Sequence, residues 1–120
     1  LVLVVDDEET VLEVAAAMLE TAGYRVLPAT DGPTAIQTFE ARRQELACIL
    51  LDRNLPGMDG LDVYRVVRAA DPTLPVVFCS GYPPDALVEA AVGSRKVPYL
   101  RKPFRYADLV GALREAIEGR

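Results

Sequence analysis

The sequence predicts an α/β fold in which a parallel sheet of five strands is covered by five helices. Five short apolar runs each end at a polar residue, a charged residue or a chain breaker, as strands buried on both faces do. Segments with helical apolar spacing alternate with these runs, and we find no internal repeat, low-complexity segment or linker. Because helices that alternate with strands carry the chain back across a sheet, we expect parallel pairing with helices on both faces.

The size and charge of the chain limit its function. At 120 residues, the chain fits a single domain over residues 1–120. We see no stretch long enough to span a membrane or to read as a signal peptide, so we expect a cytoplasmic protein. The net charge of −5 argues against direct binding of nucleic acid, which depends on clustered Lys and Arg.

Histidine and cysteine usage excludes further classes of site. The chain contains no histidine, which excludes Ser-His-Asp triads, histidine metal sites and a phosphohistidine on this chain. Cys48 and Cys79 each lie inside an apolar run, which favours reduced core thiols over a disulfide or a metal pair.

The first part of the chain predicts a strand, a helix and a second strand. Residues 1–5 form a continuous apolar run, and the carboxylates of Asp6-Asp7-Glu8-Glu9 follow directly. Residues 25–29 make a short second strand. Between the strands, a helix that stops at Gly23 is indicated by the spacing of Val11, Ala15, Met18, Leu19 and Ala22.

The middle of the chain contains the run that organises the rest. Residues 48–51 are apolar and end at Asp52, and a breaker-rich turn follows through Pro56, Gly57, Asp59 and Gly60. The short run and its breakers favour a strand over a buried helix. Asp52 then lies at the carboxyl end of a strand, where open α/β sheets collect their ligand chemistry. The preceding helix opens at Asp31-Gly32-Pro33 and is expected to turn inward Ala35, Ile36 and Phe39.

A helix and a fourth strand follow this turn. Residues 61–70 have helical apolar spacing through Tyr64 and Val67, and Asp71-Pro72 closes the helix. Residues 76–79 form the strand, which ends at Ser80-Gly81.

The last part of the chain completes the alternation. Pro83-Pro84 is expected to start a weakly amphipathic helix, and residues 97–100 form a short fifth strand before Lys102-Pro103. The apolar side of the fourth helix is expected to comprise Leu87, Ala91 and Val92. The closing helix is expected to line one face with Leu109, Val110, Leu113, Ala116 and Ile117.

Polar residues at the strand ends suggest a reaction. In a parallel sheet these residues share one edge: Asp6, Asp7, Asp52, Ser80 and Lys102. Three carboxylates in one crevice repel one another unless some are protonated or a cation lies among them, and all-oxygen ligands suit Mg²⁺. A lysine and a hydroxyl facing the same spot can bind phosphoryl oxygens. The chemistry that fits is phosphoryl transfer onto a carboxylate.

The chain resembles a receiver domain of two-component response regulators over essentially its whole length. Four motifs carry the resemblance, in this order: Asp6-Asp7, Asp52 with Pro56-Gly57-Met58-Asp59-Gly60, Ser80-Gly81, and Lys102-Pro103-Phe104. Each motif is weak alone, but together, each at a strand end, they form a strong signal. The resemblance implies a flavodoxin-like three-layer α/β/α sandwich with strand order 2-1-3-4-5.

The resemblance also implies an acceptor and a metal site. Asp52 is the position of the phosphoacceptor. Asp7, Asp52 and the backbone carbonyl of Asn54 are the implied ligands of the cofactor Mg²⁺, and Asp6 acts chiefly through a metal-bound water.

Further residues match the family's phosphoryl-binding and switch positions. Ser80 is expected to hydrogen-bond the phosphoryl group, and Lys102 to pair with it. Tyr99 stands where the family keeps a rotating aromatic side chain, although ordinary packing of a half-buried strand residue is an alternative. Gly81 leaves the approach to Asp52 open, and the peptide bond before Pro103 is one that the family holds cis.

The implied partners are proteins. A histidine kinase or histidine phosphotransfer protein donates the phosphoryl group, and an output domain or partner protein outside this chain reads the changed conformation. The pattern of residues 78–86 resembles receivers attached to hybrid sensor kinases, in which the kinase activity lies outside this chain and the parent protein can be membrane-anchored. A free-standing regulator stays open, and a homodimer through the last helix region is a further expectation.

Two other functions remain as alternatives. One is a pseudo-receiver, a binding module with the same fold that is never phosphorylated. The other is a phosphatase of the haloacid dehalogenase type, because Asp6, Glu8 and Thr10 loosely imitate its Asp-x-Asp-x-Thr signature. The phosphatase fits poorly, since glutamate replaces the second aspartate and Asp52 has no role.

Three departures from the family pattern affect what we expect. Arg53 directly follows the acceptor position and Tyr82 lies two residues beyond Ser80, so both are expected to shape the access of water to an acyl phosphate. Arg105 stands where an acidic or hydroxyl residue would cap the last helix, so this cap should be weak.

Overall fold

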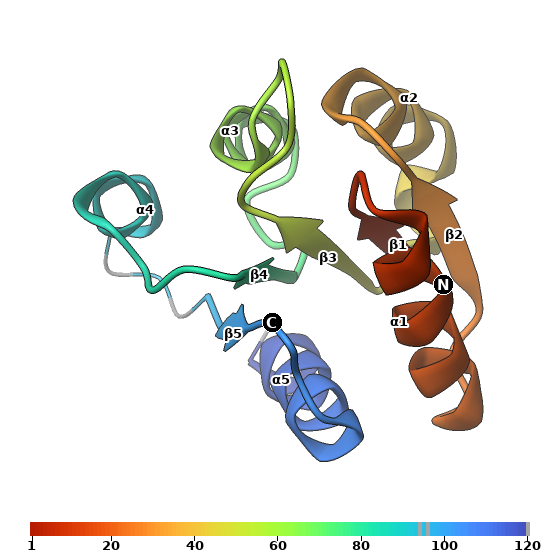
Figure 1. The fold of residues 1–120 in the computed structure, drawn as a ribbon. Coiled ribbons are helices and arrows are strands. Elements are labelled where there is room, and N and C mark those ends of the chain that lie inside the picture. The colour runs from red at the N-terminus through yellow and green to blue at the C-terminus, as the bar shows by residue number, and fades with distance from the viewer. Residues whose placement is uncertain (94, 96, 120) are drawn as a thin grey trace.

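A computed structural model describes residues 1–93, 95 and 97–119. In this part of the chain, five parallel strands form one sheet in the order β2-β1-β3-β4-β5 (Figure 1). The strands are β1 (Val2–Val5), β2 (Val26–Ala29), β3 (Cys48–Asp52), β4 (Val76–Ser80) and β5 (Tyr99–Arg101). The predicted fold class and the strand order are confirmed.

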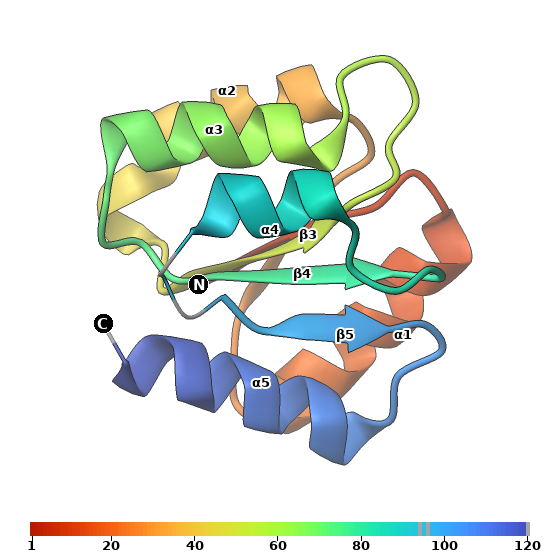
Figure 2. The ribbon, with the colours of Figure 1, turned by 90° about the vertical axis from the view of Figure 1, so that its left-hand side faces the viewer.

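Five α-helices cover the two faces of this sheet in the described residues (Figures 1 and 2). They are α1 (Glu9–Thr21), α2 (Gly32–Arg42), α3 (Gly60–Ala70), α4 (Ala86–Val92) and α5 (Tyr106–Glu118). A short 3₁₀ helix, η1 (Arg43–Glu45), extends α2. Helices α1 and α5 pack on one face, and α2, α3 and α4 on the other. No helix among the described residues has the length and apolar character needed to cross a membrane.

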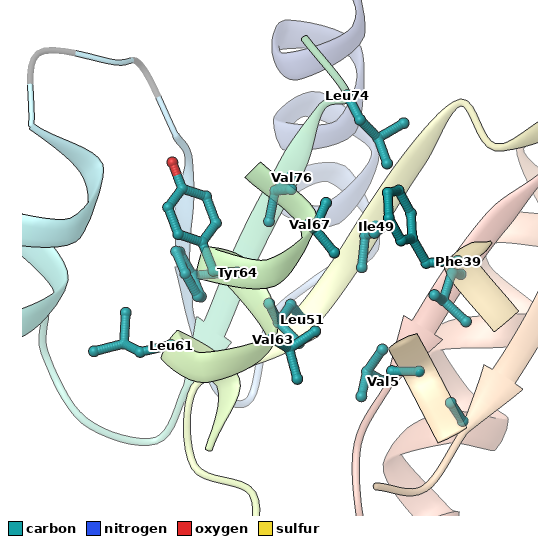
Figure 3. Close-up of a cluster of buried hydrophobic side chains, with 14 of the residues drawn as sticks. Val5, Phe39, Ile49, Leu51, Leu61, Val63, Tyr64, Val67, Leu74 and Val76 are labelled. Atoms are coloured by element: carbon teal, nitrogen blue, oxygen red, sulfur yellow. The ribbon is translucent and has the colours of Figure 1, made fainter. Parts of the chain in front are cut away.

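The core has two parts, one on each face of the sheet. Successive strand residues point to opposite faces, so Leu3 and Val5 join the cluster under α2 and α3 whereas Val2 and Val4 join the cluster under α1 and α5. Figure 3 shows the first cluster, in which side chains of α3 gather over β3. All five residues of β3 are buried, which explains its continuous apolar sequence.

The fourth helix differs from its prediction. It begins at Ala86 and not at Pro83-Pro84, because the side chain of Asp85 accepts a hydrogen bond from the Val88 amide and caps the helix there. As a result, Val88 faces the core, whereas Leu87 is 59% exposed. The prediction that Leu87 lies on the apolar face was wrong.

Smaller differences concern one helix face and one strand start. On α1, Leu12 is buried although its spacing was not singled out, whereas Val11 is half-buried. The fifth strand runs from Tyr99 to Arg101 and not over residues 97–100, since Pro98 has no amide proton to donate to a neighbouring strand.

The register of the strands fixes what meets at the carboxyl edge of the sheet. Val5 pairs with Leu51, so the residues that follow them, Asp6 and Asp52, lie side by side. On the other side of β3, Asp52 pairs with Cys79. Beyond that, the Lys102 amide donates to the Ser80 carbonyl at 2.8 Å. Residues that are far apart in sequence therefore meet at one place.

Candidate functional site

Two buried carboxylates share one lysine at this edge. The Nζ atom of Lys102 lies 2.6 Å from Oδ2 of Asp6 and 3.0 Å from Oδ2 of Asp52. Asp6 and Asp52 are only 1% and 2% exposed, so water can do little to solvate their charges. The lysine is therefore a structural counter-ion of both carboxylates.

The burial changes how these groups hold protons. Desolvation raises the pKa of Asp52 to about 6, against hydrogen bonds from the Asn54 amide and Lys102 that lower it, and the charge of Asp6 raises it further. Burial lowers the pKa of Lys102, but its hydrogen bonds to Asp6 and Asp52 outweigh burial and hold that pKa above its ordinary value. One ammonium thus faces two carboxyl groups, an arrangement with room for additional positive charge.

Asn54 and Ser80 extend the network beside Asp52. The Asn54 amide donates to Oδ1 of Asp52 at 3.0 Å, and the Ser80 hydroxyl donates to Oδ1 of Asn54 at 2.5 Å. Ser80 Oγ also accepts a hydrogen bond from the Tyr82 amide at 3.1 Å. The buried Ser80 hydroxyl is therefore connected to the Asp52 carboxylate through Asn54.

A cavity of about 690 Å³ opens in front of Asp52, and we call it the site cavity. Polar or small residues on its wall include Asp52, Asn54, Lys102 and Gly81. The remaining lining residues are Glu8, Thr10, Val11, Val14, Tyr82, Pro103 and Phe104. A Cβ atom on Gly81 would meet no atom within 4 Å, so the glycine leaves open space in the cavity wall. An external group can therefore reach the Asp52 carboxylate.

The residues at the edge suit a hard cation in part. Ligand atoms of Asp6, Asp52 and Cys79 lie within 4.8 Å of one another. Burial raises the pKa of the Cys79 thiol above its ordinary value, so the sulfur stays protonated and does not suit Mg²⁺. Asp6 and Asp52 offer the oxygen atoms that Mg²⁺ prefers. Asp7 is exposed and does not join this group in the structure.

Tyr99 and Pro103 border the site. The ring of Tyr99 is half-buried, 6.4 Å from that of Phe78 between centroids, and its hydroxyl donates to the Tyr82 carbonyl at 2.8 Å. The Lys102–Pro103 peptide bond is cis, in agreement with the resemblance. Tyr99 is thus tied to the loop after Ser80.

Arg53 occupies a different environment from the one expected. Its side chain is 10% exposed and forms ion pairs with Asp59 and Asp85, and it does not line the site cavity. Tyr82 does line the cavity, as expected. The role of Arg53 in water access is therefore not supported, and its ion pairs were missed because nothing in the local sequence joins residues 53 and 85.

As expected from the sequence, the side chain of Arg105 does not cap α5. Arg105 offers no side-chain acceptor to the first turn of α5, and its amide donates to the Asp108 carboxylate at 3.4 Å.

Comparisons with known proteins agree with this geometry. A family model described as a response regulator receiver domain matches residues 2–114. Response regulator protein TmoT of Ectopseudomonas mendocina is 29% identical over 117 residues, which are 98% of this chain and 52% of that protein. Sensor kinase CckA of Brucella abortus (strain 2308) is 32% identical over 117 residues, which are 98% of this chain and 12% of that protein.

Solved structures give the same result. The crystal structure of a response regulator receiver domain protein from Clostridium thermocellum has a TM-score of 0.90 and 28% sequence identity, and the match covers 98% of this chain and 94% of that one. The chain spans about half the length of TmoT, and a smaller part of CckA. With the family model matched over nearly its whole length, the chain belongs to the response regulator receiver domain family.

Proposed function

We propose that this receiver domain accepts a phosphoryl group from a phosphohistidine donor onto Asp52 and thereby changes its affinity for a partner. The observation that carries the proposal is the Asp52 carboxylate, which is buried but faces the site cavity with a lysine 3.0 Å away. Phosphoryl transfer needs little covalent chemistry from a protein beyond placing a nucleophile in line and stabilising charge.

In this proposal a carboxylate oxygen of Asp52 is the nucleophile. It attacks phosphorus, and the bond between phosphorus and the donor's imidazole nitrogen breaks with its electron pair remaining on that nitrogen. The Asn54 amide, bonded to Oδ1 at 3.0 Å, fixes the orientation of the carboxylate. With a pKa of about 6, Asp52 is ionised at pH 7 and available for attack.

The proposed cofactor is Mg²⁺. Asp7, Asp52 and the Asn54 backbone carbonyl would hold it directly, and Asp6 through a water molecule. When bound, the ion would neutralise charge on the transferring phosphoryl oxygens. The buried carboxylate oxygens of Asp6 and Asp52, which share a single lysine, support this choice. Asp7 is exposed in this structure and would have to turn towards them to bind the ion.

Lys102 and Ser80 are the proposed ligands of the phosphoryl group. Lys102 would exchange part of its contact with Asp52 for a phosphoryl oxygen. Ser80 would redirect its hydroxyl, which now donates to Asn54, towards the same group. Rotation of Tyr99 into the vacated space would require its bond to the Tyr82 carbonyl to break. The result is a shift between two packings, read on the face of α4, β5 and α5.

Family membership implies a histidine kinase or phosphotransfer protein as donor and an output domain or partner as receiver of the signal. The relatives include a response regulator and a sensor kinase, so both a regulator and a hybrid kinase are consistent parents. We propose that residues 1–120 form one domain that acts in the cytoplasm, is not an enzyme towards external substrates and binds proteins and not nucleic acid. A homodimer through α5 belongs to the same proposal.

Intact mass spectrometry tests the acceptor. Wild type and Asp52→Asn are incubated with acetyl phosphate and Mg²⁺, with EDTA as the metal-free control. The proposal predicts the added mass of one phosphoryl group in wild type alone, lost in EDTA. If neither acetyl phosphate nor a histidine phosphodonor adds this mass, the domain is a pseudo-receiver. Phosphate-ester turnover that survives Asp52→Asn but not Asp6→Ala would instead favour the phosphatase.

A further inference from the structure

The arginine after the acceptor connects two helices. Nη1 of Arg53 lies 2.6 Å from Oδ1 and 2.5 Å from Oδ2 of Asp59, the N-cap of α3. Its Nη2 lies 3.4 Å from Oδ2 of Asp85, the N-cap of α4. Residues 53 and 85 come from the ends of β3 and of the loop after β4, so this ion pair crosses between separate parts of the chain.

The same arginine closes the base of the loop after Asp52. Its amide donates to the Cys79 carbonyl at 2.9 Å, and its carbonyl accepts from the Gly60 amide at 3.2 Å. A Cβ on Gly60 would lie 2.1 Å from the Asp52 carbonyl oxygen, so the loop can close this tightly only with glycine. The two ends of the loop over residues 53–60 are therefore anchored beside Asp52, so a movement of this base is carried by Arg53.

We propose that Arg53 is a positioning residue that couples the state of Asp52 to the position of α4 through Asp85. This inference rests on the proposed phosphoacceptor function. Phosphorylation changes the charge and contacts beside Asn54, and any resulting movement of the loop base moves Arg53 with it. Because Arg53 is bonded to the cap of α4, the movement reaches the first turn of that helix.

Burial strengthens the hold of the Arg53 guanidinium on its acidic partners. The Arg53 side chain is 10% exposed, and its buried Nε has no hydrogen-bond partner among the described residues. Asp59 holds the guanidinium with two short contacts, of 2.6 and 2.5 Å, whereas Asp85 is 54% exposed and lies 3.4 Å away. Because water compensates a buried guanidinium poorly, the side chain should stay paired with Asp59 and carry its contact with Asp85 along when the loop base moves. Helix α4 has only seven residues and one buried side chain, Val88, and its further core contacts, from Ala91 and Val92, lie at its other end, so few contacts besides the cap hold its start.

The test uses amide NMR spectra with Mg²⁺ and beryllofluoride as the phosphoryl mimic. The variants are Arg53→Met, which keeps an apolar stem without charge, Arg53→Lys, which restores a charge, and Asp85→Ser, which keeps a hydroxyl cap. Asp31→Ser is the matched control, because Asp31 caps α2 through the Thr34 amide and no ion pair to Arg53 is found for it in the described residues. The readout is the shift of the amides of residues 86–92 relative to that of residues 52–54.

Wild type and Asp31→Ser should show mimic-induced shifts at both segments. In Arg53→Met and Asp85→Ser, residues 52–54 should respond while the α4 shifts fall to less than half, and Arg53→Lys should recover part of them. The double variant, Arg53→Met with Asp85→Ser, should lose no more of the α4 shifts than either single variant, as expected when both act through one interaction. Full α4 shifts in a folded Arg53→Met or Asp85→Ser protein overturn the inference. No response of residues 52–54 in wild type refutes the acceptor function itself.

Discussion

Replacing Asp52 with asparagine should stabilise the metal-free protein at neutral pH. The native pKa of Asp52 is raised from 3.8 to about 6, mainly by desolvation. Between these values the folded state binds more protons than the unfolded state, so the stability contributed by this carboxyl falls as pH rises. Asparagine has no such dependence, and the variant should therefore gain on wild type across this interval.

The magnitude follows from the shift. At about 1.4 kcal/mol per pKa unit, the rise from 3.8 to about 6 corresponds to about 3 kcal/mol. Part of this change falls below pH 4, where the unfolded carboxyl is already ionising, so we expect the difference in unfolding free energy to change by about 2 kcal/mol between pH 4 and pH 7. The change favours asparagine at pH 7 and nearly vanishes at pH 4.

Urea unfolding of both proteins in EDTA, at several pH values, measures this difference. Asp31→Asn is the control with opposite sign, because the hydrogen bond from the Thr34 amide lowers the pKa of the exposed Asp31 carboxyl. Its contribution is present above its unfolded pKa and is lost as pH falls. A difference between wild type and Asp52→Asn that stays constant from pH 4 to pH 7 would show that the carboxylate is not destabilised by burial.

Three further substitutions test other parts of the structure. Lys102→Met leaves Asp6 and Asp52 without their counter-ion, and urea unfolding at pH 7 in EDTA should show a loss of about 3 kcal/mol; an unchanged midpoint contradicts the shared ion pair. Ser80→Ala removes a donor to the phosphoryl group, and titration should show about tenfold weaker binding of beryllofluoride; equal affinity means that Ser80 takes no part. Phe39→Ala empties a fully buried site and should lower the unfolding free energy by about 4 kcal/mol at constant urea dependence; a loss below about 1 kcal/mol refutes its core role.

The sequence was informative wherever a residue's role depends on its own strand. The run before Asp52 predicts a buried strand, and parallel pairing places Asp6 and Asp52 at the same edge of the sheet. That they lie side by side follows from the strand order, which the family resemblance implied and the register confirms. The same reasoning placed Ser80 and Lys102 at this edge, where the Lys102 amide donates to the Ser80 carbonyl. Periodicity and breakers suffice for such positions because strand ends need no knowledge of side-chain direction.

Local sequence patterns do not predict contacts between elements that are far apart in the chain. The breakers at Pro83-Pro84 predicted that α4 starts there. The helix starts at Ala86, because the side chain of Asp85 caps it, and this cap is visible only in the structure. Arg53 reads as a residue near the acceptor, yet its side chain turns away to acids 6 and 32 positions later. The sequence pattern treats Asp6 and Asp7 alike, as adjacent acids after β1. In the structure the turn after β1 buries Asp6 and leaves Asp7 exposed.

The most direct test of the account is chemical trapping of the modified residue. The wild-type chain is incubated with Mg²⁺ and a phosphohistidine donor, and borohydride then reduces any acyl phosphate to an alcohol, which converts the aspartate concerned to homoserine. Peptide mass spectrometry should find homoserine at position 52 and unmodified Asp6 and Asp7. Homoserine at position 6, or phosphorylated protein whose Asp52 remains intact, would contradict the assignment of Asp52 as the acceptor.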